Sequence, residues 1–178
     1  GGILDVGCGD GRFLGMLQRV PRRVGVDLST SAIRFAKAFH PEVEFLVAGA
    51  SELREAFDAV VAIEVLEHIP EEGVSDFLLT LADRCRSGSH TVISVPTKNV
   101  PLTAKHYRHY DLETFDAHLH RSNAPLRIVK VDYVYFEPAW VKTLARATNN
   151  SWFRIEVPQL DRALWQFTWR HLRRATAE

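Results

Sequence analysis

The chain has 178 residues, of which 46% are hydrophobic and 25% are charged, and its 22 basic side chains balance 22 acidic ones. This composition is typical of one globular domain with a buried core, and it excludes an intrinsically disordered chain. Two cysteines are too few for a disulfide scaffold, and no apolar run reaches the roughly 18 residues of a membrane-spanning helix. The net charge of zero argues against sequence-independent binding to nucleic acid.

The balanced charge hides an asymmetry between two parts of the chain. Residues 1–95 carry 14 acidic and 9 basic side chains, a net charge of −5, whereas residues 96–178 carry 8 acidic and 13 basic ones, a net charge of +5. We therefore expect a single domain over residues 1–178, with a cofactor-binding half and an acceptor-side half. Because the chain starts directly on an apolar strand, we also expect that it is truncated at its N-terminus.

Residues 1–95 alternate between strand and helix patterns. Short apolar runs predict five strands, at residues 3–6, 23–27, 43–47, 59–63 and 91–95. Helical spacing predicts helices at residues 12–19, after an N-cap at Ser29, and at residues 74–86, the last with Phe77, Leu78, Leu81 and Cys85 on one face. Strands that alternate with helices through short loops predict an α/β, Rossmann-like fold: a doubly wound, mostly parallel sheet with helices on both faces.

The pattern changes after Pro96. We expect a polar loop at residues 97–110, then a helix at 112–120, a strand at 126–136, a helix at 140–147, an edge strand at 152–157 and a helix at 160–175. The last helix has two apolar stripes, one of which contains Trp165 and Trp169 edged with arginines. One stripe suits packing on the domain, while the other would face a hydrophobic acceptor or an anionic membrane surface. The alternative is a helix packed on both stripes within its own, more complete protein.

The first predicted strand ends in the sequence Asp5-Val6-Gly7-Cys8-Gly9-Asp10-Gly11. Alternate glycines permit a tight turn and a close approach of a ligand to the backbone. Arg12 stands where a dinucleotide-binding loop needs Gly or Ala, and the Lys-Ser/Thr pair of a P-loop is absent. Asp5 and Asp10 would repel a pyrophosphate but attract an ammonium group. With Asp27 placed to accept both ribose hydroxyls, the pattern predicts S-adenosylmethionine as the cofactor.

The chain resembles the class I S-adenosylmethionine-dependent methyltransferases from Ile3 to about Phe136, in the segments ILDVGCGDGRFL, GVDLS, FLVAGASEL and FDAVVAIEVLEHIP. The resemblance implies the same fold, methyl transfer, and cofactor contacts at the ends of four strands. These contacts would come from Asp5, Gly7, Gly9 and Asp10 at the methionine end, Asp27 and Leu28 at the ribose, Ala50 and Ser51 at the adenine, and Ile63 and Glu64 beneath the sulfonium. Glu52 is displaced by one step from the adenine-binding acid of many relatives, and we assign it no contact.

Glu64, Glu67 and His68 follow the fourth predicted strand. In a helical turn, residues at i, i+3 and i+4 project from one face, so these side chains are a candidate site for a divalent cation such as Mg²⁺. The segment resembles the ubiquinone-pathway O-methyltransferases and the small-RNA 3′-end 2′-O-methyltransferases, which are metal-assisted. A similar Glu-His-Ile-Pro segment occurs across the superfamily without metal, where it shapes the pocket floor. Both interpretations stay open.

His106 and His109 lie in the polar loop after the fifth predicted strand. Together with His68 they are candidate catalytic bases, because imidazole titrates near neutral pH and can take a proton from an acceptor hydroxyl. A further metal ligand is a second possible role for one of them. The alternative is structural, with the side chains hydrogen bonding the loop to its neighbours.

The residues and the resemblance together predict a cytoplasmic enzyme that transfers a methyl group to an oxygen of a small or lipid-like acceptor. Peripheral membrane contact through the last helix is a further expectation. One rival is a metal-assisted RNA 2′-O-methyltransferase, although no concentrated Lys/Arg stripe supports nucleic-acid binding. The other rival is a non-catalytic domain of the same fold that binds the nucleoside for structure alone.

Overall fold

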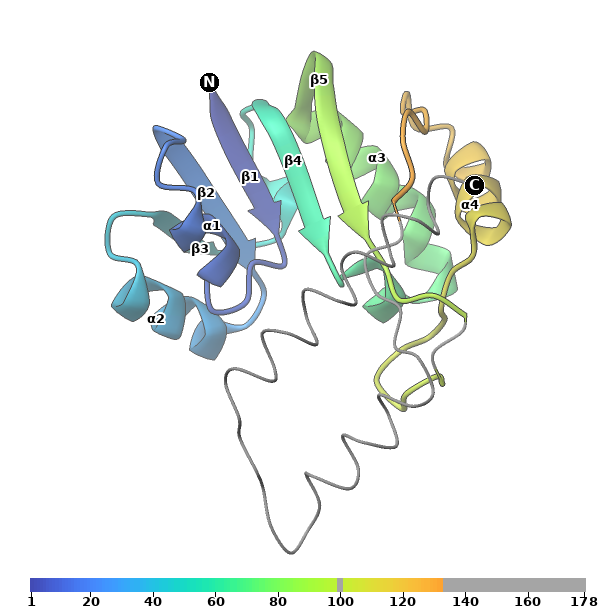
Figure 1. Cartoon of the computed structure of the whole chain (residues 1–178), viewed down its shortest axis with the longest axis horizontal. Helices are drawn as coiled ribbons and strands as arrows, with labels where there is room; N and C mark the ends of the chain where they lie inside the picture. Colours follow the sequence, from blue (N-terminus) through green and yellow to red (C-terminus); the bar gives the residue numbers. More distant parts are fainter. Residues whose placement is uncertain (99–100, 133–178) are drawn as a thin grey trace, which may run out of the picture. The chain divides into compact units, whose positions relative to one another are not determined.

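A computed structural model of the chain describes residues 1–98 and 101–132. A parallel sheet of five strands in the order β3-β2-β1-β4-β5 is the centre of these residues (Figure 1). The strands are β1 (Gly2–Val6), β2 (Arg22–Asp27), β3 (Glu44–Val47), β4 (Phe57–Ile63) and β5 (Cys85–Ser94). The strand order reverses between β1 and β4, and open α/β sheets bind their ligands at such a point. The predicted doubly wound α/β fold is confirmed.

The central strands form where the sequence is apolar on both faces of the sheet. In β1, Leu4 is fully buried, and its register partners are Val24 of β2 and Val60 of β4, which are also fully buried. Strands covered on both faces read as continuous apolar runs, which is why the pattern located these three. In the edge strand β5, the pattern located only the last residues, because the first ones are polar and mostly exposed.

Helices cover both faces of this sheet (Figure 1). They are α1 (Arg12–Met16), α2 (Thr30–Phe39), α3 (Val74–Arg84), α4 (Leu112–Ser122) and the 3₁₀ helices η1 (Ala50–Glu52), η2 (Leu66–His68) and η3 (Glu71–Gly73). On one face, α1 and α2 bury Leu14 and Ile33, while α3 packs Leu81 on the other. α4 adds Leu119 to a third apolar cluster that includes Leu78 of α3.

α2 begins where the sequence predicts. Its N-cap is Ser29, whose hydroxyl accepts a hydrogen bond from the Ala32 N–H at 3.2 Å. Ile33 is buried beneath the helix, whereas Phe35 and Phe39 are exposed and stack on each other with ring centroids 6.3 Å apart. α2 therefore places only part of its apolar sequence in the core.

Two predicted helices end earlier than expected. α1 ends at Met16 rather than at residue 19, because Leu17 leaves the helical region with φ −88° and ψ 47°. α3 ends at Arg84, so the prediction that Cys85 lies on its apolar face is wrong. Cys85 is extended, begins β5 and pairs with Phe57 of β4, so this strand starts well before residue 91. Strand pairing satisfies the backbone groups at this position in place of a further helical turn.

The predicted strand at residues 126–136 is not observed in its described part. Residues 126–132 form no strand, and Val129 and Val131 are exposed. β-branched side chains favour a strand only where neighbouring strands offer them packing, so composition alone misled this prediction. The elements predicted at 140–147, 152–157 and 160–175, with the tryptophan stripe and its membrane contact, lie outside the described residues.

Contacts within the chain divide it into two units, Gly1–Arg127 and Ile128–Glu178. All the helices and strands above belong to the first unit. The single domain expected over residues 1–178 stays a prediction. Within the part of the chain that the structure describes, no helix combines the length and the apolar character needed to cross a membrane.

Candidate active site

The glycine loop between β1 and α1 has a backbone conformation that favours glycine. Gly7, Gly9 and Gly11 have positive φ angles of 75°, 54° and 76°. A Cβ atom at Gly7 would lie 2.6 Å from Val65 Cγ2, and one at Gly11 would collide with the Phe45 ring, whereas Gly9 faces open space. The first and third glycines therefore permit close packing, and the middle one leaves room for a ligand beside the backbone.

Asp27, at the end of β2, holds this loop in place. Its Oδ2 accepts a hydrogen bond from the Gly9 N–H at 3.0 Å, and its Oδ1 accepts one from the Ser29 N–H at 2.8 Å. These bonds fix the plane of the carboxylate, and each oxygen keeps a further lone pair. Such a group suits two neighbouring hydroxyls, as the predicted ribose contact requires.

Asp5 is a buried acid at the base of the glycine loop, with only 2% of its surface exposed. Burial, with the Asp27 carboxylate as a second cause, raises the pKa of Asp5 from 3.8 to about 7. Asp5 is therefore only partly ionised at neutral pH, and a cation beside it would favour its charged form.

An open pocket of about 340 Å³ adjoins the glycine loop. It is lined by Asp5, Gly7, Cys8, Asp10, Arg12, Phe13, Met16 and Ile63. Phe13 and Met16 were not expected here, because their helical spacing in α1 is equally typical of core residues. Burial raises the pKa of the Cys8 thiol to about 12, so this thiol is not a nucleophile at neutral pH.

The other residues predicted to bind the cofactor lie just after the carboxyl ends of β1, β2 and β3. Asp10 is exposed and pairs with Arg12, whose Nη2 lies 3.3 Å from its Oδ2. Leu28 is exposed just after β2. Ala50 is buried and Ser51 is exposed in η1, which follows β3.

A second group of polar side chains lies after β4. One ligand atom each from Glu67, His68 and His106 lies within 4.8 Å of the other two. Glu67 is fully buried, and neither carboxylate oxygen has a hydrogen-bond partner among the described residues. Burial raises the pKa of Glu67, and the Glu64 carboxylate adds to this rise. A buried carboxyl group without a hydrogen-bond partner is costly, so the group suits the uptake of a proton or a cation.

Glu64 is near enough to raise the pKa of Glu67, but it is not one of the three clustered ligand residues. It has a positive φ of 54° and precedes η2, so it does not share a helical turn with Glu67 and His68. Its Oε1 accepts a hydrogen bond from the Ser94 hydroxyl at 2.7 Å. The structure thus brings His106, rather than Glu64, close to Glu67 and His68. The role of Glu64 as a metal ligand stays a prediction.

The three histidines predicted to be catalytic form one chain of contacts. The rings of His68 and His106 meet edge to face with centroids 4.7 Å apart, and His106 Nδ1 lies 2.8 Å from His109 Nε2. His68 Nδ1 donates to the Lys105 carbonyl oxygen at 3.0 Å, which directs its Nε2 toward Glu67. Loss of hydration, with His68 and His109 nearby, lowers the pKa of His106. His106 is therefore a neutral ring at physiological pH and can accept a proton.

Comparison with known proteins decides the family. A family model described as "Methyltransferase domain" matches residues 1–175. The chain belongs to the methyltransferase domain family. This match confirms the resemblance to methyltransferases that the glycine loop and the segments after it indicate.

Curated relatives are similar to part of this methyltransferase domain. The ubiquinone biosynthesis O-methyltransferase of Alkalilimnicola ehrlichii is 34% identical over 106 residues, which cover 54% of this chain and 42% of that protein. The mitochondrial enzyme of the same name from Schizosaccharomyces pombe is 32% identical over 109 residues, covering 55% of this chain and 39% of that protein. The domain thus matches about two fifths of the length of these relatives.

Solved methyltransferase structures share the fold. A TehB-like S-adenosylmethionine-dependent methyltransferase from Corynebacterium glutamicum has a TM-score of 0.55 at 27% identity, covering 68% of this chain and 64% of that one. Magnesium protoporphyrin IX methyltransferase from Synechocystis, solved with bound S-adenosylhomocysteine, has a TM-score of 0.57 at 22% identity, covering 67% and 62%. The second likeness shows the fold alone.

Asp5 should make the free energy of unfolding depend on pH. Because its pKa is raised to about 7 in the folded domain, the folded state keeps a proton that the unfolded chain has released above pH 4 or so. The free energy of unfolding should therefore fall as pH rises, by about 2–3 kcal/mol between about pH 5 and pH 8. Asp5→Asn should lack this decline. Urea unfolding of both proteins at the two pH values measures it, and equal declines would contradict the raised pKa.

Proposed function

We propose that this domain binds S-adenosylmethionine and transfers its methyl group to an oxygen of a small or lipid-like acceptor. The Asp27 carboxylate carries the cofactor assignment, because the N–H groups of Gly9 and Ser29 fix its plane and each oxygen keeps a lone pair for a hydroxyl. Gly9 leaves open space beside it. A ribose offers the matching pair of hydroxyls.

The rest of the glycine loop fits the other parts of the cofactor. S-adenosylmethionine supplies an electrophilic methyl group on a positively charged sulfur. Asp5 and Asp10 line the pocket, and their charge suits the ammonium group of the methionine end. The remaining residues keep the roles assigned from the sequence: Leu28 toward the ribose, Ala50 and Ser51 toward the adenine, and Ile63 and Glu64 toward the sulfonium.

Calorimetric titration of the purified chain tests the cofactor assignment. We expect S-adenosylmethionine and S-adenosylhomocysteine each to bind at a single site. NAD should not bind, because the Asp10 carboxylate that lines the pocket would repel its pyrophosphate. Binding of NAD in preference to S-adenosylmethionine would overturn the assignment.

The histidine group supports transfer to an oxygen. His106 is neutral at physiological pH because its pKa is lowered, and it contacts His109. It can therefore take the proton that a hydroxyl loses when it receives the methyl group, with His68 and His109 as its neighbours. Alignment of the acceptor with the methyl group would supply much of the remaining rate enhancement. The names of the relatives, ubiquinone biosynthesis O-methyltransferases, support an oxygen of a small, lipid-like acceptor.

As an alternative to the role of His106 as the base, we propose that Glu67, His68 and His106 hold a divalent cation, in which case a nitrogen of His106 binds the ion and does not accept the proton. The buried Glu67 carboxylate has no hydrogen-bond partner among the described residues, and one nitrogen of each imidazole lies within 4.8 Å of it. Two imidazole nitrogens and one carboxylate leave positions open for an acceptor oxygen, but this set suits Mn²⁺, Fe²⁺ or Zn²⁺ better than Mg²⁺, which prefers oxygen ligands. When bound, the ion would lower the pKa of an acceptor hydroxyl. Glu64 is the further ligand expected from the sequence.

Chelation tests the metal. Excess chelator should abolish methyl transfer, and an added divalent cation, Mn²⁺ or Mg²⁺, should restore it. The affinity for S-adenosylhomocysteine serves as the control, and it should not change, because Asp27 and the glycine loop belong to other strands. Full turnover of the metal-free protein in chelator would leave the group with a structural role.

A further inference from the structure

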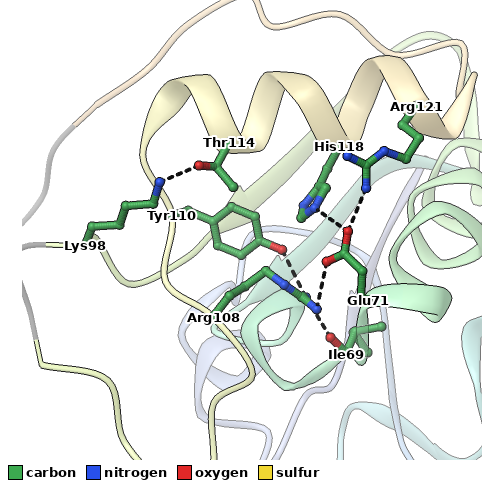
Figure 2. A network of polar contacts seen from close by, with 8 residues as sticks. All are labelled: Ile69, Glu71, Lys98, Arg108, Tyr110, Thr114, His118 and Arg121. Carbon is green, nitrogen blue, oxygen red and sulfur yellow. Dashed lines mark hydrogen bonds and ion pairs between the residues drawn. The ribbon is translucent and has the colours of Figure 1, made fainter.

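An arginine fastens the loop that carries His106 and His109. The Arg108 side chain, 15% exposed, extends toward the segment after β4 (Figure 2). Its Nη1 donates to the Ile69 carbonyl oxygen at 2.7 Å, and its Nη2 lies 3.2 Å from Glu71 Oε2. One guanidinium thus ties the histidine loop to the short segment that leads into η3.

Glu71 joins this contact to α4 through its other oxygen. Its Oε1 accepts a hydrogen bond from Arg121 Nη1 at 2.6 Å and lies 3.2 Å from His118 Nε2 (Figure 2). Burial opposes ionisation, but His118, Arg121 and Arg108 together hold the pKa of Glu71 below its usual value. Glu71 is therefore a carboxylate with partners on both of its oxygens. These partners hold the carboxylate in one orientation, and this orientation sets the position of the Arg108 guanidinium.

The neighbours of Arg108 in the chain contact the candidate site. The Tyr107 N–H donates to the Glu67 carbonyl oxygen at 2.8 Å, and His106 Nδ1 lies 2.8 Å from His109 Nε2. Arg108 thus fixes the backbone between His106 and His109, and the relative position of these two rings depends on that backbone. Release of Arg108 would let both rings move relative to Glu67.

We propose that Arg108 and Glu71 are positioning residues that hold His106 and His109 opposite Glu67 and His68. The inference rests on the proposed function of those histidines. Arginine suits this role because its planar group reaches a backbone carbonyl and a carboxylate at once, which the single ammonium of lysine does less well. An isolated ion pair on the surface contributes little to stability. The Arg108 side chain, in contrast, is mostly buried and also donates a hydrogen bond to a backbone carbonyl oxygen.

Imidazole NMR of the whole chain tests the positioning directly. The contact between His106 Nδ1 and His109 Nε2 needs one nitrogen with a hydrogen and one without, so the two rings of the parent should have matching tautomers, both Nδ1–H or both Nε2–H, in equal proportions. Long-range ¹H–¹⁵N spectra should show unequal tautomer proportions of the two rings in Arg108→Met and Glu71→Ala, with partial recovery of the match in Arg108→Lys. The matched control is Arg121→Gln, which removes an exposed partner of Glu71 but leaves His118 on Glu71 Oε1 and Arg108 on Oε2. Because Glu71 keeps a partner on each oxygen, the spectrum of this control should match the parent.

Kinetics provide a second readout. The probe acceptor is an alkylcatechol, because it joins hydroxyl groups to an apolar chain and so represents the small, lipid-like class of acceptor proposed above. Arg108→Met should lower kcat by about 10- to 100-fold, because a small displacement of a catalytic group is enough to do so. The KM for S-adenosylmethionine should not change, and Arg121→Gln should keep the parent kcat. If Arg108→Met does not fold, Arg108→Lys and Glu71→Ala give the same comparison.

Parent-like tautomers in Arg108→Met and Glu71→Ala would overturn the positioning role. So would equal effects of Arg108→Lys, Glu71→Ala and Arg121→Gln, because the network would then contribute stability alone. The proposed function fails separately, if the parent transfers no methyl group, while the spectra still decide whether Arg108 orders the histidines.

Discussion

Replacing Asp27 by alanine should weaken cofactor binding by about 1.5–3 kcal/mol, on the order of 10- to 150-fold in Kd. The ribose hydroxyls would lose a charged acceptor. The N–H groups of Gly9 and Ser29 would also lose the oxygens that they contact at 3.0 and 2.8 Å, so the ligand would have to order the glycine loop. Calorimetry with S-adenosylhomocysteine measures the loss.

Asp58→Ala is the matched control for this experiment. Asp58 is an acid near the amino-terminal end of β4, away from the glycine loop, where it pairs with Arg86. Its removal takes the same charge from the same sheet and should leave the Kd of the cofactor unchanged. If Asp27→Ala folds and binds the cofactor as tightly as the parent does, Asp27 is not the ribose-binding residue.

Replacing His106 by glutamine should lower kcat by about 10²- to 10⁴-fold while the affinity for the cofactor stays the same. Glutamine keeps a hydrogen-bonding side chain but cannot take a proton. Because the pKa of His106 is lowered from 6.5, the parent rate should rise with pH through a value below 6.5 and be level at neutral pH. Initial rates with an alkylcatechol across this pH range measure both effects.

The control for this variant is His120→Gln, at an exposed histidine of α4 whose ring contacts the Asp116 carbonyl oxygen. It should keep the parent rate and pH profile. A parent-like kcat in His106→Gln would assign the base to another member of the group, His109 or His68. A weaker affinity for the cofactor without a change in kcat would make His106 a binding residue instead.

The sheet could be predicted from the sequence because its strands are local apolar runs. Residues 3–6 and 59–63 lie within β1 and β4, and the Ser29 cap marks the start of α2. Cys85 could not be placed in this way, because its spacing fits the apolar face of α3 equally well. Its pairing with Phe57 is a long-range contact that decides between helix and strand.

The glycine loop was also predictable, since its glycines and acids adjoin in sequence. The histidine group was only partly so. Helical spacing put Glu64 on one face with Glu67 and His68, but the positive φ of Glu64 breaks that geometry before η2 begins. His106 joins Glu67 and His68 through loop contacts across nearly forty positions of the chain, such as the bond between Tyr107 N–H and the Glu67 carbonyl. No local periodicity encodes such a contact.

Transfer of a CD₃ group from labelled S-adenosylmethionine tests the proposed activity most directly. The purified chain is incubated with the labelled cofactor and alkylcatechols or a lipid extract, and the products are analysed by mass spectrometry and NMR. We predict a product that carries CD₃ in place of a hydroxyl hydrogen, formed by the parent and almost lost in His106→Gln. A parent that binds the cofactor but labels no acceptor would contradict the proposed methyl transfer, and label on nitrogen or carbon would contradict transfer to oxygen.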